Sequence, residues 1–221
     1  MAAILFGSIS TLVDTSEFQR RAFNEAFAAH GLDWTWDREE YRSMLSGNGG
    51  AQRIADYAQL RGEQVDADGI HATKSEIFQE LLKNTPVSPR PGVTDVITAA
   101  QANNVKLGLV TTTSPDNVAA LLGALPDVSR EAFDVVVDSA SVDAGKPDPA
   151  SYLYALDQLG EDAGSCIAIE DNVGGVKSAN AASVTCVAFP NENTAGGDFA
   201  QASEVVDTLD ADHLRALTSR R

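Results

Sequence analysis

Ile4-Leu5-Phe6-Gly7-Ser8-Ile9-Ser10-Thr11-Leu12-Val13-Asp14 is an apolar run followed at once by a loop of small, hydroxyl-bearing and apolar residues. Three later segments also place polar groups that suit a phosphate beside an apolar run or a stiff turn: Gly108-Leu109-Val110-Thr111-Thr112-Thr113-Ser114, Gly145-Lys146-Pro147-Asp148-Pro149 and Ile167-Ala168-Ile169-Glu170-Asp171-Asn172. Four such segments in this order predict one fold with one site, at which the ends of several strands meet.

Short continuous apolar runs predict buried strands at residues 2–6, 107–110, 133–137, 166–169 and 184–189. Continuous rather than alternating apolar strands are typical of a parallel sheet covered on both faces. Helical patterns lie between them, at residues 91–102, 116–125, 150–159 and 173–182. Ser114 and Pro115 suit the start of the second helix, and Gly160 suits the end of the third. The alternation predicts an α/β fold with a Rossmann-like, doubly wound parallel sheet.

One region breaks this alternation, because only helical patterns lie between Asp14 and about Thr85. They cover residues 17–29, 52–60 and 72–82, and Ser16 with Gln19 suits a capping box at the start of the first. We therefore predict a core of residues 1–15 and 85–221 with an inserted helical cap of residues 16–84. Ligands of open α/β sheets bind outside the carboxyl ends of the strands, so an insert leaving from that edge would roof the site.

Bulk composition excludes several classes of function. The chain has 221 residues and a formal net charge of −16, which disfavours nucleic acids and anionic membrane surfaces. No apolar run approaches the roughly 20 residues of a membrane span, and the first residues lack the basic region of a signal peptide. Cys166 and Cys186 lie in strand-like runs, which predicts buried inert thiols and a reducing, cytoplasmic location.

The polar residues at the predicted strand ends suggest a phosphate site and a metal site. Lys146, fixed between prolines before a helix, can hold a phosphate or carboxylate. Thr111 and Thr112 end a strand where a helix begins, and hydroxyls with free backbone N–H groups there bind anions. Glu170 and Asp171 end another strand and offer the oxygen ligands that Mg²⁺ prefers.

With these residues the chain resembles the haloacid dehalogenase-like superfamily, in its β-phosphoglucomutase-like and phosphoglycolate-phosphatase-like branch. The resemblance also includes Thr11-Leu12-Val13-Asp14-Thr15, Arg90-Pro91-Gly92-Val93, and Gly175-Val176 after the acidic pair. It implies a Rossmann-like core, a helical cap inserted after the first strand, Mg²⁺ as cofactor, and small phosphorylated metabolites as substrates.

The chain departs from the family at the residues that carry its chemistry. Aligned on residues 11–14, the family's nucleophilic aspartate falls at Gly7 and its acid/base aspartate at Ile9. Glycine has no side chain and isoleucine cannot transfer a proton, so the catalytic residues of this chain are unknown. Loss of one ligand also predicts weakened Mg²⁺ binding at Glu170 and Asp171. Fewer carboxylates near Lys146 favour binding of an anion without metal.

The sequence shows no convincing replacement nucleophile, and its cap does not identify a substrate. Ser8 and Ser10 would need a base, and the sequence places none of the three histidines beside the first strand. In the cap, a loop with Gly47 and Asn48 is expected to face the site. Arg53 is the nearest basic candidate to that loop.

Gln19 stands where relatives often carry a histidine. Trp34 and Trp36 fit packing within the cap better than stacking on a ligand.

Three functions follow from these expectations. The first is a phosphatase-like homologue, inactive or very weak by the family mechanism, that binds a small phosphorylated metabolite or inorganic anion. The second is an active phosphomonoester hydrolase that uses non-standard groups such as Asp14, Glu170 or Asp171. The third is a regulatory or structural protein with an empty site. The sequence identifies no protein partner.

Overall fold

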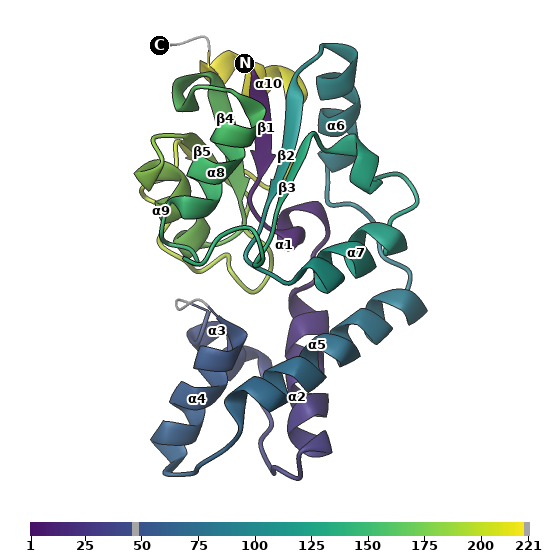
Figure 1. Ribbon diagram of the computed structural model, residues 1–221, viewed down its shortest axis with the longest axis vertical. Coiled ribbons are helices and arrows are strands. Elements are labelled where there is room, and N and C mark those ends of the chain that lie inside the picture. The colour runs from purple at the N-terminus through teal and green to yellow at the C-terminus, as the bar shows by residue number, and fades with distance from the viewer. Residues whose placement is uncertain (46–48, 219–221) are drawn as a thin grey trace.

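The protein is built around a parallel six-stranded sheet with the strand order β3-β2-β1-β4-β5-β6 (Figure 1). The computed structural model describes residues 1–45 and 49–218. The strands are β1 (Ala3–Phe6), β2 (Lys106–Val110), β3 (Val135–Val137), β4 (Cys166–Glu170), β5 (Thr185–Ala188) and β6 (Glu204–Val205). The five strands predicted from apolar runs are present. The two-residue β6 was missed because it has no apolar run.

The central strand brings the predicted site segments together. Phe6, the last residue of β1, pairs in register with Leu109 of β2 on one side and with Ile169 of β4 on the other. Because all three strands are parallel, their carboxyl ends meet at one edge of the sheet. The loops after Phe6, Val110 and Glu170 therefore start side by side.

Helices cover both faces of the sheet, which confirms the doubly wound arrangement. Alternate residues of β1 point to opposite faces, with Ile4 and Phe6 in one apolar cluster and Ala3 and Leu5 in the other. The first face is covered by α6 (Val93–Ala102), α7 (Pro115–Ala124) and α10 (Ala211–Thr218). The second is covered by α8 (Ala150–Leu159) and α9 (Val173–Ala181). Short helical turns occur at α1 (Ile9–Leu12), η1 (Arg130–Ala132) and η2 (Ala163–Ser165).

Four helices between β1 and β2 form a separate group beyond the carboxyl ends of the strands (Figure 1). They are α2 (Ser16–Ala29), α3 (Arg38–Ser43), α4 (Gly50–Arg61) and α5 (Ala67–Asn84). Their common core is aromatic and includes Trp34 and Trp36, which are buried as packing residues. Residues 16–84 as an independent cap domain stay a prediction.

Local capping follows the sequence in some places and departs from it in others. Ser114 caps α7 by accepting from the Asn117 N–H, and Gly160 ends α8 with a left-handed backbone, as predicted. The capping box predicted at Ser16 and Gln19 is wrong. Ser16 is already helical, and its N–H and hydroxyl donate to Asp14 at 3.0 and 2.5 Å. Among residues 1–45 and 49–218, no helix has both the length and the apolar character needed to cross a bilayer.

The turn before α6 requires a glycine. Gly92 has φ +82°, and a Cβ there would overlap the carbonyl of Leu209 and lie 2.9 Å from its nitrogen. Gly31 has a similar φ of +74° but nothing within 4 Å of the corresponding position. The first glycine meets both a conformational and a packing constraint, and the second meets only the conformational one.

We therefore expect Gly92→Ala to lower the free energy of unfolding by roughly 3 kcal/mol or more, because backbone strain adds to a steric overlap. Gly31→Ala is the matched control and should cost roughly 1–2 kcal/mol from strain alone. Urea denaturation of both variants measures the difference. Equal losses would contradict the proposed role of the Leu209 contact.

Candidate functional site

Lys146 joins the ends of the three central strands. Its side chain is buried, and its Nζ donates to the carbonyl of Gly7, to the carbonyl of Val110 at 2.7 Å and to Glu170 Oε1 at 2.6 Å. An ammonium group has three N–H donors, and these acceptors match that number. Anion binding by Lys146 stays a prediction and would require one of these bonds to be exchanged.

Glu170 is the buried counter-charge of this lysine. Its Oε1 also accepts from the Tyr152 hydroxyl at 2.7 Å, while Oε2 has no hydrogen-bond partner among the described residues. Burial raises the pKa of Glu170, and the adjacent Lys146 opposes that shift. Burial and the neighbouring Glu170 carboxylate likewise raise the pKa of Tyr152 well above its usual value.

Glu170 and Tyr152 fill the space beside Gly7. A Cβ on Gly7 would overlap the Glu170 carboxyl group and lie 2.5 Å from the Tyr152 hydroxyl. Ile9 is buried in the apolar cluster on one face of the sheet, and its carbonyl accepts from the Val13 N–H at 3.2 Å. Residues 7–9 therefore bring a backbone, a hydroxyl and an alkyl group to the site, but no carboxylate.

Asp171 is held by neutral donors. Its Oδ1 accepts from the Ser8 hydroxyl at 2.8 Å and from the Asn172 amide at 3.0 Å. Its Oδ2 accepts from the Asn191 amide at 3.1 Å. Ser8 and Asn191 were not predicted as partners of Asp171. Asn191 lies in the loop after β5, and no local pattern links it to β4.

The predicted oxygen ligands do not fit a Mg²⁺ site. Mg²⁺ demands near-octahedral oxygen ligation and is usually held through one or two free carboxylates. Here Glu170 Oε1 is bound to Lys146 and Tyr152, which leaves Oε2 as its one oxygen without a partner among the described residues. Asp171 accepts three hydrogen bonds, and Gly7 adds no ligand. In the described part of the chain, no group of three or more His, Cys, Asp or Glu residues could hold a metal ion.

The Thr111 segment lies next to this network. Thr111 is buried, and its hydroxyl accepts from the Thr113 N–H at 3.2 Å. Thr112 is exposed, and Ser114 begins α7. The structure thus places a hydroxyl-rich turn at the end of β2, directly beside the lysine, as the sequence predicted. Its binding of an anion is untested.

The cap contributes a second group of cations. Lys74 of α5 is 5% exposed, and its Nζ donates to Gln19 Oε1 and lies 4.9 Å from the Phe23 ring centroid. Burial, reinforced by the Arg53 charge, lowers the pKa of Lys74 to about 7. The Arg53 guanidinium lies 5.8 Å from the Tyr41 ring centroid, and its Nε donates to a backbone carbonyl at 3.1 Å.

Lys74 was missed by the sequence analysis although a signal exists. It interrupts the apolar stripe of α5 at four-residue spacing, between Ile70 and Phe78, which are both buried. A lysine on the buried stripe of a helix needs a partner or a ligand. His71, one turn away on the same helix, has its pKa lowered to about 4 by burial and by the charges of Lys74 and Arg53. Gly47 and Asn48 lie outside the described residues.

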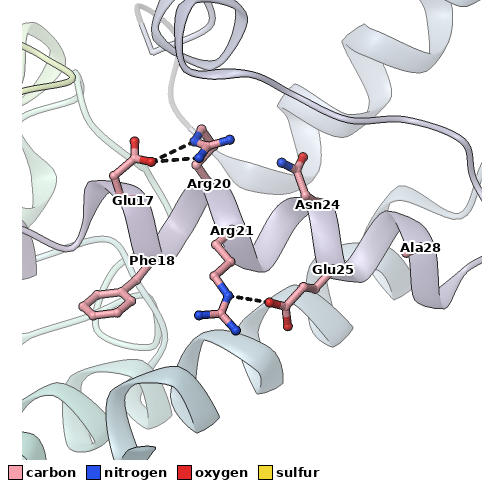
Figure 2. Close-up of a pocket in the computed structure, with 7 residues that line it drawn as sticks. All are labelled: Glu17, Phe18, Arg20, Arg21, Asn24, Glu25 and Ala28. Atoms are coloured by element: carbon pink, nitrogen blue, oxygen red, sulfur yellow. Dashed lines mark hydrogen bonds and ion pairs between the residues drawn. The ribbon is translucent and has the colours of Figure 1, made fainter. Parts of the chain in front are cut away.

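Two cavities border the cap. The cavity in Figure 2, of about 490 Å³, lies along α2 and is lined by Glu17, Phe18, Arg20, Arg21, Asn24, Glu25 and Ala28. Its charges are paired along the helix, Arg20 with Glu17 at 2.9 Å and Arg21 with Glu25 at 2.6 Å (Figure 2). It includes none of the predicted site residues.

The second cavity adjoins the strand ends. It has a volume of about 460 Å³ and is lined by residues of α3, of α9 and of the loop after β5, among them Arg42, Asn172, Lys177 and Asn193. Asn172 follows Asp171 directly and caps α9 by accepting from the Gly175 N–H at 2.8 Å. This cavity is therefore an approach to the site between the helical group and the sheet.

Comparison with known proteins identifies the family of this chain. Protein CbbY of Cereibacter sphaeroides is 40% identical over 214 residues, which cover 94% of this chain and 92% of that protein. The crystal structure of CbbY from Rhodobacter sphaeroides in complex with phosphate matches with a TM-score of 0.87 and 38% identity over 94% of each chain. A variant of that protein was crystallised with xylulose-(1,5)-bisphosphate.

More distant structures share the fold. β-Phosphoglucomutase from Clostridium difficile matches with a TM-score of 0.82 at 20% identity over 99% of this chain and 97% of that chain. A profile of haloacid dehalogenase-like hydrolases matches residues 1–183. The chain therefore belongs to the haloacid dehalogenase-like hydrolase family.

Proposed function

We propose that this protein binds a small phosphorylated metabolite or inorganic anion between its sheet and its helical cap, and that it is inactive or very weak by the family's hydrolytic route. The proposal rests on the residues at the end of β1. Gly7 and Ile9 bring no carboxylate there, and Glu170 with Tyr152 fills the space beside Gly7. The family's nucleophilic and acid/base aspartates align with these two residues.

Without a nucleophilic and an acid/base carboxylate, phosphate-ester hydrolysis is expected to be very slow. In a well-studied hydrolase, loss of the nucleophile alone lowers turnover by about 10⁶-fold. Uncatalysed hydrolysis of phosphate monoesters is among the slowest reactions known. To position a phosphate, Lys146 must exchange one of its three bonds, and positioning without a nucleophile leaves the largest part of the barrier in place.

The proposed ligand is an anion because Lys74, a buried cation of the cap, has no carboxylate partner among residues 1–45 and 49–218. That lysine donates to the neutral amide oxygen of Gln19 and lies against aromatic rings. A desolvated cation gains most from a counter-charge that arrives with a ligand. Phosphate and xylulose-(1,5)-bisphosphate, found with the CbbY structures, are anions of this kind.

One contact favours a second candidate, a hydrolase with a serine nucleophile. The Ser8 hydroxyl donates to Asp171 Oδ1 at 2.8 Å, which is the geometry of a nucleophile with an adjacent base. The Ser8 hydroxyl oxygen also accepts from the Ser10 N–H at 2.9 Å and caps α1, so a structural role accounts for the contact equally well. Ser8→Ala distinguishes the catalytic role from the structural one, because hydrolysis would be abolished only if Ser8 is the nucleophile.

We expect the purified protein to hydrolyse para-nitrophenyl phosphate and xylulose-1,5-bisphosphate no faster than its Lys146→Ala variant, because neither has a nucleophile at Gly7. The double substitution Gly7→Asp with Ile9→Asp should raise the rate, provided that the Glu170 side chain turns away to make room. Released phosphate is the measurement, and thermal melting checks that each variant is folded. Wild-type turnover that survives repurification and disappears in Lys146→Ala would refute the proposal of an inactive site.

We further expect sulfate to bind more tightly at pH 6 than at pH 8. With a pKa of about 7, Lys74 is mostly charged at the lower pH and mostly neutral at the higher one, which predicts a change in Kd of up to about tenfold. Sulfate keeps its charge over this range, and calorimetry gives the Kd.

Lys74→Met should remove the pH dependence. Lys83→Met is the matched control, because Lys83 lies on the same helix but is exposed and paired with Glu80 at 2.6 Å. A wild-type Kd that is the same at both pH values would exclude Lys74 from the anion site.

A further inference from the structure

The three donors around Asp171 have fixed orientations. Asn172 Oδ1 accepts the Gly175 N–H at the start of α9, so its amide nitrogen faces Asp171. Asn191 Oδ1 accepts the backbone N–H groups of Asn193 and Thr194, at 3.0 and 3.1 Å, so its amide nitrogen also faces the carboxylate. Neither amide can be flipped without losing bonds at both of its ends.

Ser8 is oriented in the same way. Its oxygen accepts the Ser10 N–H at 2.9 Å, which leaves its proton for Asp171. The carboxylate thus receives one hydroxyl and two amide donors, a neutral shell in place of a cation. These contacts engage both oxygens of the Asp171 side chain without a metal ion.

The same network reaches the helical cap. Asn191 shapes the turn that presents Asn193, whose amide nitrogen donates to Glu17 Oε1 of α2 at 2.9 Å. Asn193 is 3% exposed and the Glu17 side chain 38% exposed, so this contact between sheet loop and cap helix is buried on the Asn193 side only. Glu17 is held in turn by Arg20 at 2.9 Å and by Arg38 at 3.4 Å.

From these contacts we propose that Asp171 serves in this chain as a hydrogen-bond anchor and holds no divalent cation. The neutral donors occupy the place of an ion. Ser8 connects Asp171 to the end of β1, and Asn191 connects it to the loop after β5 that contacts the cap. The proposal departs from the Mg²⁺ use of the family. It concerns metal binding and stability, so its outcome is independent of whether the protein hydrolyses any ester.

The decisive variant is Asn191→Asp, which keeps the acceptor for the two backbone N–H groups and turns the donor facing Asp171 into a second carboxylate oxygen. Two facing carboxylates repel each other without a metal and form a cation site with one. Without metal, we expect the melting temperature of Asn191→Asp to fall by roughly 5 °C or more relative to wild type. Mg²⁺ at 10 mM should restore at least about 3 °C of that loss.

Wild type should show no shift between EDTA and 10 mM Mg²⁺. Asn180→Asp is the matched control, because it adds the same charge on α9 at a residue whose amide donates to Gln201 and not to Asp171. Its melting temperature should not depend on Mg²⁺.

Binding of Mn²⁺ followed by electron paramagnetic resonance gives a readout that does not depend on folding energy. We expect no stoichiometric Mn²⁺ on wild type and one ion on Asn191→Asp. If Asn191→Asp does not fold, Ser8→Asp places a carboxylate on the other side of Asp171 and still supplies an N-cap for α1. Stoichiometric Mn²⁺ on wild type that is lost in Asp171→Asn would overturn the proposal. The proposal would also fail if neither Asn191→Asp nor Ser8→Asp binds more Mn²⁺ than wild type.

Discussion

The buried ammonium of Lys146 links the three central strands at the edge where the site lies. Its first acceptor is the carbonyl of Gly7, directly after β1, and its second is the carbonyl of Val110, the last residue of β2. The third is the carboxylate of Glu170, the last residue of β4. Breaking a buried ion pair by removing one partner typically costs several kcal/mol, because the other charge is left without compensation. The Lys146–Glu170 pair therefore constrains both the shape of the strand ends and the residues that can stand beside them.

This constraint also fixes which polar groups meet at the strand ends. Glu170 lies against Gly7 because Lys146 and Tyr152 hold its Oε1, and the missing side chain at Gly7 leaves room for that arrangement. Asp171, one residue on, accepts from donors that also cap α1 and α9 or shape the loop after β5. Glu170, Asp171 and Lys146 here bond to the ends of strands and to the loops that follow them. The fold is kept while the polar groups bond mainly to one another.

The sequence predicted the elements better than the contacts between them. The start of α7 at Ser114 and Pro115 and the end of α8 at Gly160 are local signals, and both are found as expected. The sequence could predict that Lys146 has an anionic partner, but not which one. Its partners lie 24 to 139 residues away in the chain, and only the strand order brings them together. Asn191 was missed for the same reason, because a loop amide can be interpreted only once its neighbours are known. Lys74 was missed although its place on the apolar stripe of α5 marks it as buried.

The burial of Lys74 within a molecule of net charge −16 has a kinetic consequence. An acidic surface repels an approaching anion over distances of about a Debye length, roughly 8–10 Å at moderate ionic strength, whereas the buried cation attracts it only at close range. Added salt screens the outer repulsion more than the shielded inner attraction. Under the proposed function, anion capture should thus become faster as ionic strength rises, the reverse of the behaviour of enzymes that steer their substrates with a charged surface.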